Sequence, residues 1–250
     1  MSPRKRKSVG KQKTAIVVPC HNEERRLDVG AFEGFLREEP SVVFIFVDDG
    51  SSDGTAELLR GMESRNPRCR MVLQTPNRGK ASAVSAGFRE AFEGDFKFIG
   101  FWDADLATPL DAIPKFLEIL ESGERDCVFG CRVARMGAEI RRRAWRHYVG
   151  RVYATLISMI LRMPVYDTQC GAKIFRRSEL LEKAFADPFA TKWVFDVELI
   201  ARMKKLDPAF PERIHEHPLE RWIDIEGSKV SFWDGLAAFA DLFRIWSRYG

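Results

Sequence analysis

Long apolar runs are missing from this chain of 250 residues. No stretch approaches the roughly 20 residues that a transmembrane helix needs. The longest candidate, residues 152–161, is interrupted by Thr155 and Ser158. The basic segment from Pro3 to Lys7 has no apolar core of a signal peptide beside it. We therefore expect a cytoplasmic protein that is associated with a membrane peripherally.

Cysteine is scarce as well, with five residues, and no pair has the spacing of a zinc finger. An odd, scattered set of this kind is typical of reduced and mostly buried thiols in a cytosolic protein. The sequence thus offers neither a disulfide framework nor a structural zinc site.

Two common phosphate-binding motifs are also absent. The first predicted strand is not followed by G-x-G-x-x-G, which removes the main argument for a dinucleotide-dependent oxidoreductase. Gly79-Lys80 does not form a Walker A loop, because Gln74 stands where the first glycine belongs and Ala81 where serine or threonine belongs. Any nucleotide must be bound in another way.

The net charge of +4 comes from the N-terminus. Residues 1–13 hold six Lys or Arg and no acid, which leaves 34 basic against 36 acidic residues in the rest of the chain. The folded body is therefore not expected to bind nucleic acid. The tail is either a disordered solubilising arm or a segment attracted to anionic lipid.

Strand and helix patterns alternate along residues 14–121, which predicts an α/β fold with a mostly parallel central sheet flanked by helices. In such sheets, ligands bind beyond the carboxyl ends of the strands. The expected strands are 14–19, 42–47, 70–74 and the central strand from Phe98, and the expected helices start near Ala56 and cover 81–92 and about 110–121.

The central strand leads into two carboxylates, Asp103 and Asp105. On an extended backbone, residues i and i+2 point to the same side, so these carboxylates can converge while Ala104 points away. Such a half-site suits Mg²⁺ or Mn²⁺ that is shared with substrate phosphates. The alternative is a pair of caps for the next helix, with Pro109 in its first turn.

Other polar residues should meet this pair at the same edge of the sheet. Asp48 or Asp49 can accept hydrogen bonds from a base or ribose, and Lys80 can approach phosphate. Taken singly, Lys80 could be a solvated first-turn residue and Asp53 a helix cap. Together, the set favours a nucleotide-diphosphate site.

The ordered series of motifs resembles family 2 glycosyltransferases, which have the GT-A fold, over about residues 14–245. The later blocks are similar to dolichyl-phosphate β-glucosyltransferases and, more loosely, to dolichol-phosphate mannose synthases. The blocks that carry the resemblance are 19–23, 47–55, 77–80, 103–105, 167–171, 193–199 and 225–229.

The resemblance implies a nucleotide-sugar site with Mg²⁺ or Mn²⁺ held by Asp103 and Asp105. In the mannose synthases a metal-binding glutamine follows the second aspartate by two residues, and Ala107 occupies that place here, which favours the glucosyl relatives. The positions matching the nucleotide-sugar site are Pro19, Glu23, Asp48, Asp49, Lys80, Asp103 and Ala104.

For the acceptor, the resemblance implies that Arg132 and Arg146 bind a lipid phosphate. In the mechanism that we expect, Asp167 aligns the acceptor or serves as a base. Residues 132–151 contain seven Arg against one acid and run into the apolar stretch 152–161. This segment and the amphipathic C-terminal stretch suit helices lying in a membrane interface. Ordinary packing on the sheet is the equal alternative.

The expected function is the inverting, metal-dependent transfer of a hexose, most simply glucose from UDP-glucose, onto a polyprenyl or dolichyl phosphate at an anionic membrane. One alternative is a GT-A glycosyltransferase with a hydroxyl acceptor on a glycan or glycolipid, which would need Asp167 or Asp196 as its base. Another is a catalytically silent nucleotide-sugar-binding module that docks on membranes. The expected organisation is a basic tail at 1–13, a GT-A domain at 14–230 and an amphipathic helix at 231–250.

Overall fold

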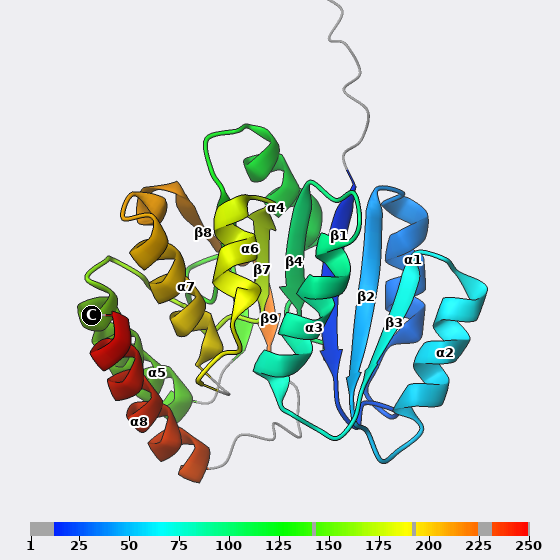
Figure 1. The fold of residues 1–250 in the computed structure, drawn as a ribbon, viewed down its shortest axis with the longest axis horizontal. Helices are drawn as coiled ribbons and strands as arrows, with labels where there is room; N and C mark the ends of the chain where they lie inside the picture. Colours follow the sequence, from blue (N-terminus) through cyan, green and yellow to red (C-terminus); the bar gives the residue numbers. More distant parts are fainter. Residues whose placement is uncertain (1–12, 142–143, 192–193, 225–231, 250) are drawn as a thin grey trace, which may run out of the picture.

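The computed structural model describes residues 13–141, 144–191, 194–224 and 232–249, with the side chains of 144–149 and 232–239 left undescribed. Its centre is a seven-stranded sheet (Figure 1). Almost every residue of the central strands is buried, as expected for strands covered on both faces. The strand order is β3 (Cys69–Gln74), β2 (Val42–Asp49), β1 (Thr14–Cys20), β4 (Phe98–Trp102), β7 (Ala172–Arg176), β5 (Cys127–Cys131) and β8 (Ile214–Pro218).

The sheet is mostly parallel, as the alternation of strands and helices predicted. Strands β1 to β4 pair in parallel, and β5 pairs in parallel with β8. In the described residues, β7 is the exception, because it runs antiparallel to both β4 and β5. The sheet therefore keeps one common carboxyl edge, at the lower side of Figure 1.

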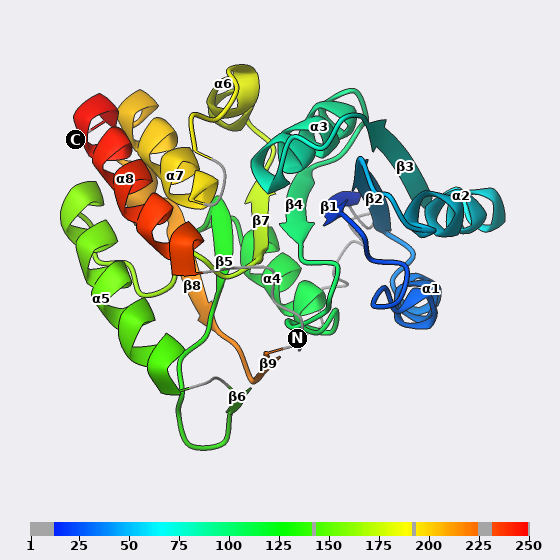
Figure 2. The same cartoon turned by 90° about the horizontal axis from the view of Figure 1, so that it is seen from below.

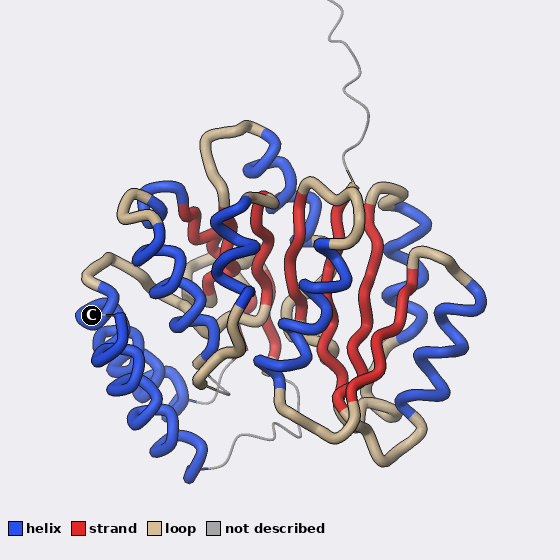
Figure 3. The backbone as a smooth tube through the Cα atoms, viewed as in Figure 1, coloured by secondary structure: helices blue, strands red, loops and turns tan. Residues whose placement is uncertain are grey.

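Helices cover both faces of the sheet (Figures 2 and 3). One apolar core forms beneath α1 (Val29–Glu38), α2 (Thr55–Arg65) and α4 (Ala112–Glu121). The other forms beneath α3 (Lys80–Phe92), α6 (Glu179–Ala186) and α7 (Phe195–Leu206). Helix α1 was not expected from the sequence, although Asp28 caps it by accepting from the Ala31 N–H at 2.9 Å.

Two long helices, α5 (Ala144–Leu161) and α8 (Phe232–Tyr249), lie side by side on the outer flank beyond α7 (Figures 1 and 2). They contain the two amphipathic stretches noted in the sequence. Both also contribute to a core, through Ile157 and Leu161 of α5 and Leu242 and Ile245 of α8. No helix in the described ranges is long and apolar enough to cross a membrane.

A small second sheet pairs β6 (Glu139–Arg141) with β9 (Arg221–Ile223) in parallel. It is tied to the loop after β4, because the Ile223 N–H donates to the Ala107 carbonyl at 3.2 Å. The segment between β5 and α5 is thereby held beside the carboxyl edge of the main sheet.

Candidate active site

The loops that follow β1 and β2 form one wall of the candidate site and bind each other. The Asn22 N–H donates to Ser51 Oγ at 2.9 Å, and the Glu23 N–H donates to Thr55 Oγ1 at 2.8 Å. Asn22 adopts a left-handed conformation with φ of 53°. Glu23 is 7% exposed, and its carboxylate accepts from Arg26 Nε at 2.9 Å. These contacts hold Glu23 at the carboxyl edge of the sheet, where the sequence placed it.

Asp49 organises the loop in front of α3. One carboxylate oxygen accepts from Gln74 Nε2 at 2.5 Å and from the Arg78 N–H at 2.9 Å, and the other accepts from the Gly79 N–H at 2.7 Å. Asp49 is 3% exposed. The sequence places it in a nucleoside pocket, and in this structure its carboxylate holds the loop that leads to Lys80.

The Asp48 carboxylate is also engaged in hydrogen bonds within its own loop. It is buried, and one of its carboxylate oxygens accepts from both the N–H and the hydroxyl of Ser51. Asp53 accepts from the Thr55 N–H at 3.1 Å, at the first residue of α2, although the N-cap position itself is Gly54. Pro19 lies half-buried near the carboxyl end of β1. Pro19, Asp48 and Asp49 thus lie together beside the site.

The two carboxylates after β4 converge for a different reason from the one expected. Strand β4 ends at Trp102, and residues 103–106 form a turn in which the Leu106 N–H donates to the Asp103 carbonyl at 3.3 Å. Leu106 has φ of 54°, in the left-handed region. The expectation that strand alternation brings Asp103 and Asp105 together was therefore wrong, since the turn does so. Ala104 is buried in the core, and its place in the nucleotide-sugar site stays a prediction.

Lys80 reaches this turn from the first residue of α3, after Gly79 with φ of 89°. Its Nζ lies 2.5 Å from Asp103 Oδ1, and neither side chain is fully buried. Burial lowers the pKa of Lys80, but the charges of Asp103 and then Asp196 outweigh it, and the net direction is upward. The structure therefore brings Lys80 and Asp103 together as a charged pair, and their place beside a diphosphate stays a prediction.

At Asp105, in contrast to Lys80, the surroundings disfavour the charged form of the side chain. Burial, and next the charge of Asp103, raise its pKa above the ordinary 3.8. Its Oδ1 accepts from the Ala107 N–H at 3.0 Å. A carboxylate whose charged form is disfavoured beside a second carboxylate is relieved by a cation, so this pair fits Mg²⁺ or Mn²⁺.

The protein would share such an ion with a ligand. Among the described residues, no cluster of three or more His, Cys, Asp or Glu side chains could hold a metal on its own. Ala107, which follows Asp105 by two residues, is 8% exposed, and its side chain has no ligating atom. Open coordination positions of this kind are what a bound diphosphate fills.

Behind the Lys80–Asp103 pair lies a buried ion pair whose lysine the sequence did not single out. Lys173 on β7 is 0% exposed, and its Nζ donates to Asp196 Oδ1 at 2.6 Å and to the Cys170 carbonyl at 2.6 Å. Its ammonium also lies 5.1 Å from the centre of the Phe101 ring. The only sequence signal was an apolar strand interrupted by one lysine. The pair places a second negative charge close to Lys80.

On the other side of the site, Arg132 and Asp167 form a bidentate pair. Arg132 Nε donates to Asp167 Oδ2 at 2.6 Å, and Nη2 donates to Oδ1 at 2.7 Å. The Arg132 guanidinium carbon lies 5.2 Å from the centre of the Trp222 ring. Burial lowers the pKa of Arg132, but Asp167 outweighs it and the pKa is raised. The charge of Asp103 also acts on Arg132, so the two halves of the site are neighbours.

Glu216 on β8 anchors this second half. Its carboxylate accepts from the Tyr166 N–H at 2.9 Å and from the Asp167 N–H at 2.8 Å. No local sequence pattern marks Glu216, because its partners are about fifty positions away. Arg146 belongs to α5, but its side chain is outside the described part of the structure. The segments 193 and 225–229, which carried part of the resemblance, are outside it as well.

The sequence matches a known family along most of this fold. The profile described as "Glycosyl transferase family 2" matches residues 15–183. A dolichyl-phosphate beta-glucosyltransferase of Drosophila melanogaster is 31% identical over 252 residues, which cover 94% of this chain and 74% of that protein. The protein of the same name from Homo sapiens is 31% identical over 94% of this chain and 75% of its own length.

A solved structure shares the fold. Glucosyl-3-phosphoglycerate synthase from Mycobacterium tuberculosis, in complex with Mn²⁺, UDP-glucose and phosphoglyceric acid, superposes with a TM-score of 0.65 at 20% identity. The match covers 94% of this chain and 80% of that one. At this level of identity the likeness concerns the fold.

Proposed function

The chain belongs to glycosyl transferase family 2, and we propose that it transfers glucose from UDP-glucose to a polyprenyl phosphate with inversion at the anomeric carbon. Relatives at 31% identity are named dolichyl-phosphate beta-glucosyltransferases, which supports this donor and acceptor class. The GT-A fold implied by the sequence resemblance is confirmed by the shared fold of the solved glycosyltransferase.

The donor half of the proposal rests on Lys80, Asp103 and Asp105. Lys80 Nζ, 2.5 Å from Asp103, is placed to hold diphosphate oxygens as negative charge grows on the departing nucleotide. Asp103 and Asp105 would hold Mg²⁺ or Mn²⁺, which when bound would screen the diphosphate charge. The Mn²⁺ and UDP-glucose in the solved synthase support this assignment.

The nucleoside would lie against the loops after β1 and β2, over Pro19 and Glu23. These loops are joined by the Asn22–Ser51 and Glu23–Thr55 hydrogen bonds. A wall fixed in this way loses little entropy when a nucleoside binds. Asp48 would support the wall from behind, because its carboxylate accepts from the Ser51 N–H. Asp49 would hold the neighbouring loop before α3, because its carboxylate accepts from the Gly79 N–H.

The single observation that favours a phosphate acceptor is the Arg132–Asp167 pair. A phosphate monoester has a second pKa of about 6, so it is already largely an anionic nucleophile at neutral pH and needs no strong base. Asp167 is bound through both oxygens by Arg132 and is therefore suited to aligning the guanidinium. Arg132, with Arg146 from α5, would present positive charge to the incoming lipid phosphate.

A hydroxyl acceptor makes a different demand. Its proton must be removed, which requires a base with an available carboxylate oxygen. In the described residues, both Asp167 and Asp196 are engaged by a cation, Arg132 and Lys173 respectively. A silent module would use the Lys80, Asp103 and Asp105 cluster for binding alone, whereas relatives at 31% identity are named as transferases. We therefore rank both alternatives below the phosphate acceptor.

The protein would act at the cytoplasmic face of an anionic membrane, in peripheral contact. The acceptor requires it, because a long polyprenyl chain stays in the bilayer while its phosphate lies at the interface. The basic residues of segment 132–151 and the flanking helices α5 and α8 supply the attraction that such contact needs.

The test is transfer itself. The full chain is incubated with labelled UDP-glucose, Mn²⁺ and a short polyprenyl phosphate dispersed in detergent, and glucosylated lipid is measured against the dephosphorylated alcohol. We expect product with the phosphate only. Product with the alcohol alone would favour the hydroxyl acceptor, and no product with any of a panel of nucleotide sugars would favour the silent module.

A further inference from the structure

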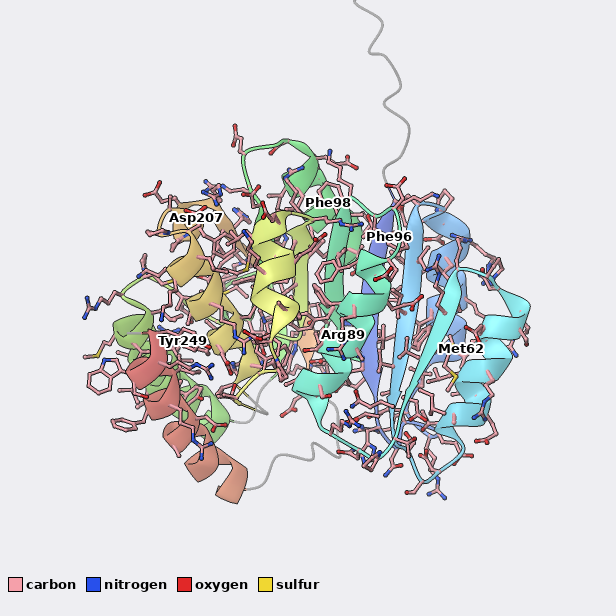
Figure 4. The ribbon with its side chains drawn as sticks, viewed as in Figure 1. Met62, Arg89, Phe96, Phe98, Asp207 and Tyr249 are labelled. Atoms are coloured by element: carbon pink, nitrogen blue, oxygen red, sulfur yellow. The ribbon has the colours of Figure 1, made fainter. Side chains whose placement is uncertain are left out.

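A cavity of about 300 Å³ lies far from the candidate active site, where the C-terminal ends of α5, α7 and α8 meet. Figure 4 shows this region on the outer flank, near Tyr249. The polar part of the lining is cationic and includes no acidic residue. The lining residues on which the argument depends are Leu161, Arg162, Lys204, Lys205, Ile245 and Arg248.

Helix capping explains only part of this positive charge. Lys204 Nζ donates to the Leu161 carbonyl at the end of α5, and Lys205 Nζ donates to the Arg248 carbonyl at 3.1 Å. Each helix C-terminus carries about −0.5 charge, so three ends together offset roughly −1.5. Arg162, Lys204, Lys205 and Arg248 carry four positive charges. A surplus of roughly two positive charges is left for an anion.

Apolar side chains lie exposed on the same two outer helices. Val152 and Met159 on α5 are 60% and 68% exposed, and their spacing of seven residues puts them on one face. Phe243 and Trp246 on α8 are 64% and 51% exposed, with ring centres 5.7 Å apart. Since α5 and α8 lie side by side (Figure 2), large apolar groups accompany the cationic cavity along one flank.

We propose that this cavity binds the phosphate headgroup of an anionic membrane phospholipid, while Val152, Met159, Phe243 and Trp246 enter the upper acyl region. A cationic cavity beside exposed apolar and aromatic side chains matches the chemistry of a bilayer surface. A soluble anion would leave the apolar groups in water. The inference rests on the peripheral membrane contact proposed above and is independent of the transfer reaction.

The site would orient the enzyme as well as attach it. Helix α5 has 18 residues and is therefore about 27 Å long, with Arg146 near its first residue and Arg162 directly after its last. With the phospholipid site at one end and the acceptor arginine near the other, α5 lies parallel to the membrane plane. Both lipid phosphates then sit at the same interfacial depth.

The experiment measures binding of the full chain to vesicles by flotation, without donor or acceptor. Vesicles of phosphatidylcholine alone are compared with vesicles that also contain phosphatidylglycerol. The charge variant is Arg162→Gln with Lys205→Gln, and the matched control is Arg60→Gln with Arg65→Gln on α2, which sit in exposed ion pairs at the opposite end of the sheet. We expect binding that requires phosphatidylglycerol and falls about 25-fold in the charge variant, about fivefold per cation.

The double variant Phe243→Ser with Trp246→Ser tests the apolar part and should also weaken binding. Thermal unfolding checks that each variant is folded. Glucose transfer to a detergent-dispersed acceptor should be unchanged in these variants. Failure of the transfer proposal and failure of the membrane-site proposal therefore give different results. The proposal is overturned if vesicle binding of the wild type does not depend on phosphatidylglycerol, or if the α2 control weakens binding as much as the charge variant does. It is also overturned if inorganic phosphate at moderate concentration displaces the protein from vesicles.

Discussion

The carboxylate of Asp103 packs against the backbone of Gly171, where an added Cβ would lie 1.8 Å from Asp103 Oδ2. The Asp103 N–H also donates to the Gly171 carbonyl at 3.0 Å. The turn after β4 and the residue before β7 therefore meet at a position that only glycine can fill while Asp103 stays in place.

Gly171→Ala should displace the Asp103 carboxylate and lower kcat/KM for the donor by about 100-fold, the effect expected of a misplacement near 1 Å. Gly150→Ala is the matched control, because a Cβ there meets nothing within 4 Å and helix α5 should gain up to about 1 kcal/mol. Kinetics and thermal unfolding of both variants decide the matter. Unchanged kcat/KM in Gly171→Ala would show that the Asp103 position is unimportant.

Asp105 should make the stability of the metal-free protein depend on pH. Its pKa is raised in the folded state, so its stabilising contribution is present below the unfolded value of about 3.8 and is lost as pH rises through the folded pKa. With UDP present, Mn²⁺ should therefore raise Tm more at neutral than at mildly acidic pH. Asp105→Asn should raise the metal-free Tm at neutral pH and abolish the Mn²⁺-dependent increase. A variant that keeps the full increase would exclude Asp105 as a ligand.

Asp167→Asn should separate alignment from base catalysis. If Asp167 orients Arg132, the Asn variant keeps part of the hydrogen bonding to Arg132. We then expect kcat to fall less than about tenfold and KM for polyprenyl phosphate to rise. Loss of a catalytic base would instead cost about 10²–10⁴ in rate. Arg132→Lys should raise the same KM, since lysine cannot reproduce the two-pronged contact. A kcat loss above a thousandfold with unchanged KM in Asp167→Asn would favour a hydroxyl acceptor.

The free energy of unfolding of Lys173→Met should be lower by about 3–5 kcal/mol, because Asp196 is left buried without its partner. The double variant Lys173→Met with Asp196→Leu should recover most of that loss, as replaced buried pairs commonly do. Urea unfolding measures both. Activity should not recover with stability, because the Asp196 charge that acts on Lys80 is gone. Full recovery of kcat would limit the pair to a structural role.

Much of the fold followed from local patterns. Apolar runs and turn residues located β1, β2 and β3 to within two residues at each end and the start of β4 at Phe98, and the polar clusters were expected at their carboxyl ends. The extended backbone expected through Asp105 ends instead at Trp102. Helix α1 was overlooked although its signals are present, with Asp28 as cap and Phe32, Phe35 and Leu36 on one buried face. The reversed direction of β7 has no local signal, because strand direction depends on the path of the chain. The proposed boundaries at residues 13 and 230 stay predictions.

The motifs also located Lys80, Asp103, Asp105, Arg132 and Asp167, because residue type and spacing limit which side chains can meet a diphosphate or a lipid phosphate. Their roles stay predictions. What only the tertiary structure decided is how each charge is balanced: Asp49 against the 78–79 backbone, Asp167 against Arg132, and Lys173 against Asp196. These partners are 23 to 35 positions apart. A sequence shows which groups are charged, but burial and contact between distant strands determine which of them remain available for chemistry.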